Sequence, residues 1–407
     1  MAQKKSAIPL KIKEFIKYIK SSGLVKYSDA NKEYLFSINE GAKMPLEKLK
    51  NIYNHEVTGG DYYDYKDYIL ASLDDVIDLV FEPKAQQIIP SSFGGLVKLN
   101  TYKEFNSTSE PSNDLSLWLE YLERLFPVHK EREVIVKYLA HMFQKPLERP
   151  SWHLLFTSDT GTGKGFLFSD ILTHLLCKQV SQVSSYSDVT AKHSTCFDST
   201  MLLMLDDPKS KSESTMIQIK SKLSEPYIAV ERKYEAASMV KIFTRVILAS
   251  NEKRPLKLDE NERRWFAPEY MEHKVNTGET QLFITKLSEW LNDGGLEAIH
   301  EYLLSYSLDG FNHKSVYQTD TLKSMIASSV PVLVEELSDW IEDKIVFSWD
   351  ELVATFQAPN NLLKKYITEL GYKQTRTTIQ RKKLRLWHPA SYSTEQVKET
   401  FNPTKLF

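Results

Sequence analysis

The feature that most constrains this chain is a short glycine-containing stretch between two apolar runs. Residues 154–156 are apolar, residues 158–165 read Ser-Asp-Thr-Gly-Thr-Gly-Lys-Gly, and a second apolar stretch follows. This order predicts a strand, a tight loop and a helix. Glycines let such a loop fold back, so that its N–H groups and the positive end of the following helix can surround a phosphate group. We call residues 158–165 the glycine loop.

The glycine loop departs twice from the full phosphate-binding pattern. Ser158 stands where a first glycine is usual, and Gly165 stands where a Ser or Thr hydroxyl usually holds Mg²⁺. Lys164 can still reach the β- and γ-phosphates of a nucleotide. A glycine-rich surface turn is the alternative interpretation. The predicted phosphate contacts are Thr160, Gly161, Thr162, Gly163, Lys164, Gly165 and Phe166.

An acidic strand end is the first partner that a phosphate loop needs. Residues 201–205 are apolar and end in Asp206 and Asp207. A buried parallel strand delivers its last residues to the carboxyl edge of the sheet, beside the phosphates. We therefore expect Asp206 to hold Mg²⁺ through water and Asp207 to act as the base that polarises the attacking water.

Two further polar groups follow a second apolar strand, residues 243–250. Asn251 at its tip can bond the γ-phosphate or the attacking water, although by itself it is equally a turn residue. Arg263 and Arg264 can include an arginine finger, which stabilises charge on the transferring phosphoryl group and which, when supplied in trans, requires a ring or another oligomer. The alternative for the two arginines is a surface ion-pair cluster with nearby glutamates.

A basic hairpin is expected between these two strands. Residues 227–240 alternate on both sides of Arg232, Lys233 and Tyr234. Two cations and an aromatic ring suit single-stranded nucleic acid, because cations bind phosphates and a ring stacks on a base. An ordinary basic turn is the alternative.

Length and composition limit the other possibilities. The 407 residues allow two or three domains, and the net charge of −2 excludes a uniformly basic coat but not local basic patches. Cys177 and Cys196 have no CxxC partner, so a disulfide framework and a zinc site are not expected. No apolar run reaches the roughly 20 residues that cross a bilayer. These features favour a cytoplasmic protein, in a bacterial host, without a membrane partner.

The rest of the chain divides by pattern into a multidomain α/β protein. Residues 1–106 predict a small, helix-rich N-terminal module, in which residues 10–21 form an amphipathic helix with a basic face that can contact DNA or a partner. Residues 107–150 predict a helical collar for oligomerisation. Residues 151–306 predict the nucleotide-binding core with trailing helices, and residues 307–329 a polar linker.

The last segment, residues 330–407, predicts three helices followed by a hairpin, which is the pattern of a winged-helix domain. Its third helix and hairpin hold eight Lys or Arg residues but one acid, Glu369, between residues 361 and 388. DNA contact is the favoured interpretation and a solvated hairpin is the alternative. The predicted contacts are Lys364, Lys365, Arg376, Arg381, Lys382, Lys383 and Arg385.

The order of these features resembles the superfamily-3 helicases, and more narrowly the poxvirus-type and phage or plasmid primase-helicase ATPases. The resemblance rests on the glycine loop, the acidic strand, the basic hairpin, Ser250-Asn251 and Arg263-Arg264-Trp265, and it spans residues 95–390. It implies a P-loop AAA+ core and a hexameric ring around single-stranded DNA. It also implies 3′-to-5′ translocation driven by ATP with Mg²⁺, during replication of a phage, plasmid or genomic island.

Two departures from that family affect the expected chemistry. Asp207 replaces the usual Glu, which shortens the base by one methylene, and Gly165 removes a metal-binding hydroxyl. A primase is often fused upstream in the family, but residues 1–106 contain neither a zinc-ligand cluster nor a convincing pair of catalytic aspartates. We therefore expect a helicase that works with a separate primase or another replication protein. A nucleotide-regulated, origin-binding initiator and a small-molecule kinase are the alternatives.

Overall fold

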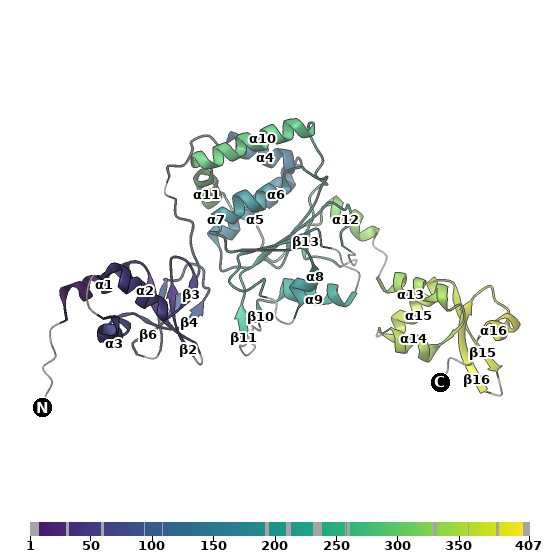
Figure 1. Cartoon of the computed structure of the whole chain (residues 1–407). Helices are drawn as coiled ribbons and strands as arrows, with labels where there is room; N and C mark the ends of the chain where they lie inside the picture. Colours follow the sequence, from purple (N-terminus) through teal and green to yellow (C-terminus); the bar gives the residue numbers. More distant parts are fainter. Residues whose placement is uncertain are drawn as a thin grey trace, which may run out of the picture.

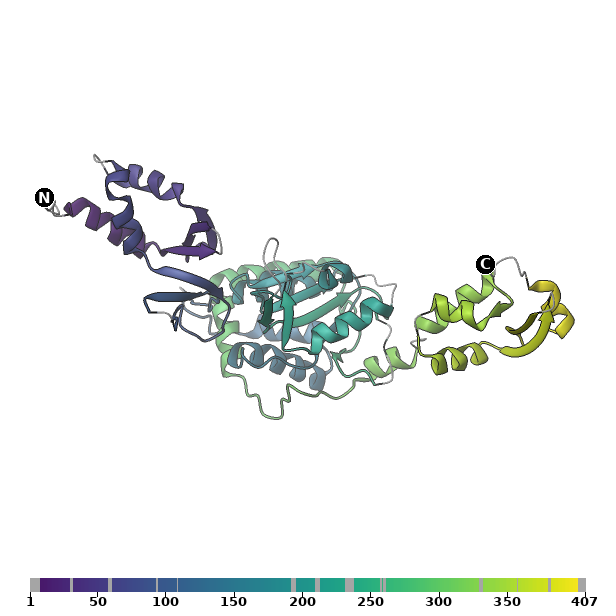
Figure 2. The same cartoon turned by 90° about the horizontal axis from the view of Figure 1, so that it is seen from below.

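The computed structural model describes residues 8–401, except 30–31, 58–60, 93, 108, 192–194, 209–212, 231–237, 257, 259–260, 329–331, 357 and 380–381. The fold is mixed α/β with several sheets. Figures 1 and 2 show three parts that follow one another along the chain: an N-terminal part, a larger central part and a C-terminal part. Among the described helices, none is both long and apolar enough to span a bilayer.

The N-terminal part is a six-stranded sheet with helices on one face. Ile12 and Ile19 of the first helix and Tyr53 of the second pack against Leu24 and Leu35 of the sheet. The strand order is β3-β2-β1-β4-β6-β5. The elements are α1 (Leu10–Ser21), β1 (Leu24–Asp29), β2 (Lys32–Ser37), β3 (Ala42–Pro45), α2 (Glu47–Glu56), α3 (Tyr62–Ser72), β4 (Asp75–Val80), β5 (Ile88–Pro90) and β6 (Leu96–Asn100).

The central part is built on a five-stranded parallel sheet with the order β13-β7-β12-β9-β8. All five strands run in the same direction, so their carboxyl ends lie at one edge. The strands β7, β9 and β12 are almost entirely buried, which explains their continuous apolar sequences. The strands are β7 (His153–Thr157), β8 (Val180–Val183), β9 (Leu202–Asp206), β12 (Arg245–Ser250) and β13 (Trp265–Phe266).

Helices cover both faces of this sheet, because successive strand residues point to opposite sides. Leu154 and Phe156 pack in a core with α4, α5, α10 and α11, whereas Leu155 between them packs in the opposite core with α8, α9 and α12. Figure 1 shows the two helical layers on either side of the sheet. The bounds are α4 (Ser116–Leu125), α5 (His129–Gln144), α6 (Lys164–Phe166), a π-helical segment (Leu167–Leu172), α7 (Thr173–Leu175), α8 (Tyr186–Thr190), α9 (Glu213–Ser224), α10 (Thr277–Trp290), α11 (Leu296–Ser305) and α12 (Asp320–Ala327).

A two-stranded hairpin, β10 (Tyr227–Val230) and β11 (Ser238–Lys241), leaves the central part after α9. This hairpin was predicted from the sequence. Its tip, with Arg232, Lys233 and Tyr234, lies outside the described residues.

The C-terminal part is a helical cluster with a three-stranded sheet of order β14-β16-β15. The side chain of Ser348 accepts a hydrogen bond from the backbone of Glu351, so it caps the second helix of this part. Gly371 follows the third helix with φ +83°, a conformation that favours glycine. The elements are α13 (Val332–Asp343), β14 (Phe347–Ser348), α14 (Trp349–Thr355), α15 (Asn360–Glu369), β15 (Tyr372–Ile379), β16 (Lys382–Pro389) and α16 (Thr394–Thr400).

The N-terminal module contains the predicted helix at residues 10–21, as α1, and two further helices, α2 and α3. Its short strands also join one sheet, although each is too brief to show a clear period-two pattern. One expectation about local structure was wrong. The polar segment 307–329 is not only a linker. It contains α12, whose Leu322 and Met325 are buried in the core beneath the central sheet.

Candidate functional site

The carboxyl edge of the central sheet brings together the polar groups that the sequence predicts to act as one site. Ser250 at the end of β12 lies opposite Thr157, which precedes the glycine loop, and Ala249 lies opposite Asp206 at the end of β9. Because the three strands are adjacent and parallel, the glycine loop, Asp206-Asp207 and Asn251 emerge side by side. In an open parallel sheet, this edge is where ligands bind.

The glycine loop has the backbone that its glycines predict. Gly161 and Gly163 have φ values of +84° and +97°, which residues with a Cβ rarely adopt. Ser158 does not need to be glycine, because it continues β7 in a strand-like bridge to Met271. Its N–H donates to the Ser250 carbonyl at 3.1 Å, and its hydroxyl donates to the Asp159 carbonyl at 2.8 Å.

Lys164 lies at the centre of the site. Its Nζ donates to Oδ1 of Asn251 at 2.8 Å. Burial lowers the pKa of the Lys164 amine, and the negative charges of Asp206 and Asp207 oppose that effect. The cation therefore lies within electrostatic reach of both carboxylates as well as in contact with the amide.

The two carboxylates are held differently. Oδ2 of Asp206 accepts a hydrogen bond from Nε2 of Gln182 on β8 at 3.0 Å. Oδ1 of Asp207 accepts a bond from the buried Ser250 hydroxyl at 2.6 Å, and Asp207 has a left-handed φ of +46°. Neighbouring acids with separate partners can take separate chemical roles.

Helices α4 and α10 support the glycine loop from behind. Tyr121 of α4 is fully buried, and its hydroxyl donates to the Gly163 carbonyl at 2.8 Å. Burial raises the pKa of this phenol well above its usual range. A Cβ placed on Gly163 would lie 3.3 Å from Cδ1 of Ile284 on α10. The sequence did not single out Tyr121, because an aromatic residue in an apolar helix stripe has the same signal as an ordinary core residue.

The segment after β13 bonds to residues near the start of the glycine loop. The Tyr270 hydroxyl donates to Oδ1 of Asp159 at 3.0 Å, and Nε2 of His273 lies 2.9 Å from the Thr160 carbonyl. These two residues were also missed, since no motif marks them. The glycine loop is thus held by β7 and β12, by the segment after β13, and by helices α4 and α10.

A cavity of about 750 Å³ opens between the glycine loop and α10. This volume is in the range of pockets that hold cofactor-sized molecules. Residues 160–166 and Asn251 line one side, and Thr277, Gln281 and Ile284 line the other. The cationic amine of Lys164 and the backbone of the loop line this cavity, and the carboxylates of Asp206 and Asp207 lie within electrostatic reach of that amine. Together these groups can accommodate a phosphate chain and a divalent cation.

Arg263 and Arg264 are not part of this cluster within one chain. They precede β13, and the Arg264 carbonyl accepts a bond from the N–H of His153 at the start of β7, so both lie at the opposite, amino edge of the sheet. Arg264 is half-buried, donating to Oγ of Ser224 at 2.9 Å and pairing with Glu262 at 3.6 Å. Arg263 is exposed. Within one chain, Arg263 therefore does not reach the site.

The second group of predicted residues lies in the C-terminal part, where α15 and the β15–β16 hairpin carry exposed cations. Arg376 lies directly opposite Arg385, and Thr378 lies opposite Lys383. Two like charges facing each other across strands are unfavourable unless an anion neutralises them. The structure places Lys364, Lys365, Arg376, Lys383 and Arg385 as exposed residues and Lys382 in β16, while Arg381 lies outside the described residues.

These cations share one side of the hairpin. Trp387 packs with the cluster of α13, α14 and α15, and Arg385 and Lys383 lie on the same face of β16 because they are two and four residues before it. Leu386 and Val397 pack on the other face, which α16 covers. Figure 1 shows α15 and α16 on opposite sides of the hairpin. The face of the hairpin that carries the cations is therefore the face that packs against the helices, next to α15. We call α15 together with this face the basic corner.

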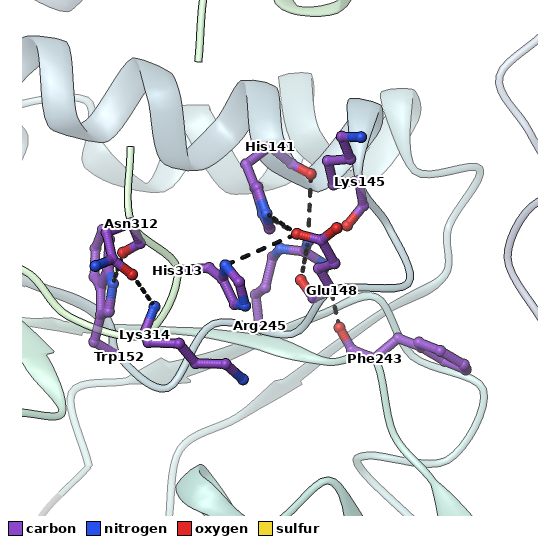
Figure 3. A network of polar contacts seen from close by, with 9 residues as sticks. All are labelled: His141, Lys145, Glu148, Trp152, Phe243, Arg245, Asn312, His313 and Lys314. Atoms are coloured by element: carbon purple, nitrogen blue, oxygen red, sulfur yellow. Dashed lines mark hydrogen bonds and ion pairs between the residues drawn. The ribbon is translucent and has the colours of Figure 1, made fainter. Parts of the chain in front are cut away.

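A separate polar cluster lies at the amino edge of the central sheet (Figure 3). Nε2 of His141 is 3.4 Å and Nδ1 of His313 is 3.8 Å from Oε2 of Glu148, a spacing that a metal ion could bridge. However, Nη2 of the buried Arg245 lies 3.2 Å from Nδ1 of His141. Arg245 can only donate, so Nδ1 accepts and the proton of the neutral ring sits on Nε2, where a metal would bind.

This cluster is therefore better described as a structural connection. Nη2 of Arg245 also lies 3.4 Å from the carbonyl of His141 in the last turn of α5, and 3.1 and 3.0 Å from the carbonyls of Lys145 and Glu148 just after it. It thus ties the end of α5 to the start of β12. Burial and the Arg245 charge lower the pKa of His141 to about 4. His141 is thus neutral at pH 7, which keeps the bond from Arg245.

Comparisons with known proteins connect the chain to phage replication proteins. A family described as a family of unknown function, DUF5906, matches residues 156–264. Over 279 residues, 62% of this chain, the sequence is 23% identical to the DNA primase-polymerase of Nitratiruptor phage NrS-1. The match spans 38% of that relative's length.

Solved structures of the NrS-1 C-terminal region share the fold. One apo structure superposes with a TM-score of 0.60 at 15% identity, covering 93% of this chain and 99% of the other. A second, the A form, has a TM-score of 0.59 at 16% identity and covers 92% and 98% of the two chains. The likeness extends over the N-terminal, central and C-terminal parts together.

Proposed function

We propose that the chain is an ATP-driven DNA helicase or translocase that acts in the replication of a phage, plasmid or genomic island. One observation carries the proposal: Lys164, Asp206, Asp207 and Asn251 meet at one sheet edge beside a cavity of about 750 Å³. The similarity to a phage DNA primase-polymerase supports the replication role and DNA as the substrate.

Two structural patterns support the proposed fold families. In the central part, the glycine loop follows β7, which lies between β13 and β12 in an all-parallel sheet, as suits a P-loop AAA+ core. In the C-terminal part, three helices precede a hairpin, and the third helix adjoins its cationic face, as suits a winged helix.

In the proposed reaction, each group at the sheet edge has one role. The loop amides and Lys164 hold the triphosphate and neutralise charge that develops on the γ-phosphoryl group. Asp207, fixed by the Ser250 hydroxyl, accepts a proton from the attacking water. Oδ1 of Asn251 accepts a 2.8 Å bond from the Lys164 amine, the same amine that would bind the γ-phosphate. When the γ-phosphate binds, it would replace Asn251 as the partner of Lys164. The change of partner lets Asn251 report that the γ-phosphate is present.

The donors at this edge also fit Mg²⁺, which prefers oxygen ligands and keeps several waters. Asp206 offers a half-buried carboxylate within electrostatic reach of Lys164, where the phosphate chain would end. When bound, the ion would neutralise phosphate charge. Asp206 is the proposed ligand, through water.

Assembly and DNA contact complete the proposal. The position of Arg263 at the far edge of the sheet supports a ring, expected to be a hexamer, in which Arg263 serves the neighbouring subunit's site. The basic corner would contact duplex DNA. Arg232, Lys233 and Tyr234 would contact a single strand in the ring, with Lys233 moving as the nucleotide state changes.

Gly163 and Gly165 offer a matched pair of substitutions in the loop. Gly163→Ala should destabilise the observed conformation of the loop by about 1–3 kcal/mol, since φ is +97° and the new Cβ would meet Ile284 at 3.3 Å. Gly165→Ala should be tolerated, because nothing lies within 4 Å of its Cβ position. Titration with a fluorescent ATP analogue should show strongly reduced affinity for the first variant only. Equal affinity for both variants would contradict the proposed role of the loop.

Tyr121→Phe tests the support behind the loop. The change leaves the partly buried Gly163 carbonyl without the donor on Tyr121, which costs about 1–3 kcal/mol, and the loop should lose its fixed shape. Tyr138→Phe is the control, since Tyr138 is equally buried but bonds His153, 3.2 Å away at the amino edge. Both variants should lower the melting temperature, but only Tyr121→Phe should raise the KM for ATP.

A strand-displacement assay tests the proposed function itself. We expect the full chain to separate a short duplex with a single-stranded tail when ATP is present, and not with a non-hydrolysable analogue. Tight duplex binding without displacement would favour the origin-binding initiator. Absence of both DNA binding and displacement would leave the alternative of a small-molecule kinase.

A further inference from the structure

The position of Gly165 leaves a chemical gap at the proposed metal site. A side-chain hydroxyl is usual at this position and holds Mg²⁺, but Gly165 has no side chain. The structure shows that a side chain would fit, since no atom lies within 4 Å of a Cβ built there and φ is not positive. The absence of the hydroxyl is therefore not forced by crowding.

Gln182 is the neighbouring group that can make up for this gap. It lies on β8, adjacent and parallel to β9, in register with Met204. Its Nε2 donates to Oδ2 of Asp206 at 3.0 Å, and within the described residues this is the only hydrogen bond that the Asp206 carboxylate accepts. The other oxygen, Oδ1, thereby keeps one orientation and stays available as an acceptor.

We propose that Gln182 is a positioning residue that orients the Asp206 carboxylate for Mg²⁺, in place of the hydroxyl missing at Gly165. This rests on the proposed nucleotide-binding function. A carboxylate with no fixed partner loses rotamer freedom when it binds an ion, whereas one already held by an amide does not. Outer partners of this kind typically change metal affinity by about 10–100-fold.

The experiment measures Mn²⁺ binding to the full chain with ADP by electron paramagnetic resonance, alongside ADP binding in EDTA. Gln182→Ala should weaken Mn²⁺ binding about tenfold or more and leave metal-free ADP binding unchanged. Gly165→Ser in the Gln182→Ala background should restore much of the Mn²⁺ affinity, because it supplies the hydroxyl directly. Ser184→Ala, an exposed change just after β8, is the control and should have no effect.

Two results would overturn the inference. One is an unchanged Mn²⁺ affinity in Gln182→Ala. The other is an equal loss of ADP binding with and without metal, which would indicate general damage to the site. If the unaltered chain binds no nucleotide at all, the proposed function fails instead, so the two failures are distinguishable.

Discussion

Replacing Lys164 by alanine should reduce ATP hydrolysis by at least about 100-fold, the usual effect of removing one charge-stabilising donor. The Lys164 amine is the cation that contacts Asn251 at 2.8 Å and lies within reach of Asp206 and Asp207. Without it, two carboxylates would face the triphosphate with no side-chain cation of the glycine loop to offset them. Phosphate release from the purified chain measures the effect.

Lys286→Ala is the matched control, because it removes an exposed lysine from α10 without touching the sheet edge. Its hydrolysis rate should equal that of the unaltered chain. Hydrolysis that persists at the normal rate in Lys164→Ala would show that the reaction takes place elsewhere, or not by the proposed chemistry.

Arg376→Glu should weaken duplex DNA binding while making the C-terminal part more stable. In the folded chain Arg376 faces Arg385, and a glutamate there would turn a repulsive cross-strand pair into an attractive one, worth about 0.2–1 kcal/mol. The same change removes a cation from the basic corner. We expect an increase in melting temperature together with a fall of about tenfold or more in affinity for a duplex.

Salt dependence shows whether Arg376 binds a DNA phosphate. If it does, the slope of log affinity against log salt should become shallower by about one in Arg376→Glu. Lys398→Glu in α16 is the control, since α16 covers the opposite face of the hairpin, and it should leave both affinity and slope unchanged. Equal effects of Arg376→Glu and Lys398→Glu would mean that DNA binding depends on net charge alone.

The sequence was most informative where one residue type has one structural meaning. The buried strands around Leu154, Leu203 and Val246 are continuous apolar runs, and the strand predicted at the apolar residues 154–156 is β7. Glycines at φ values of +84° and +97° shaped the loop as predicted.

The sequence was least informative where a role depends on tertiary contact. Tyr121 and Gln182 are separated from the glycine loop or from Asp206 along the chain, and nothing in their neighbours distinguishes them from ordinary core or surface residues. Likewise, α12 was hidden because only Leu322 and Met325 of an otherwise polar segment reach the core. The position of Arg263 at the far edge required the strand order.

ATP hydrolysis by the purified full chain, measured with and without single-stranded DNA, tests the proposed helicase function most directly. We expect hydrolysis that requires Mg²⁺ and rises several-fold when DNA is added, because the nucleotide site and the DNA-contacting elements belong to one machine. Hydrolysis that is absent, or that DNA leaves unchanged, would contradict that function.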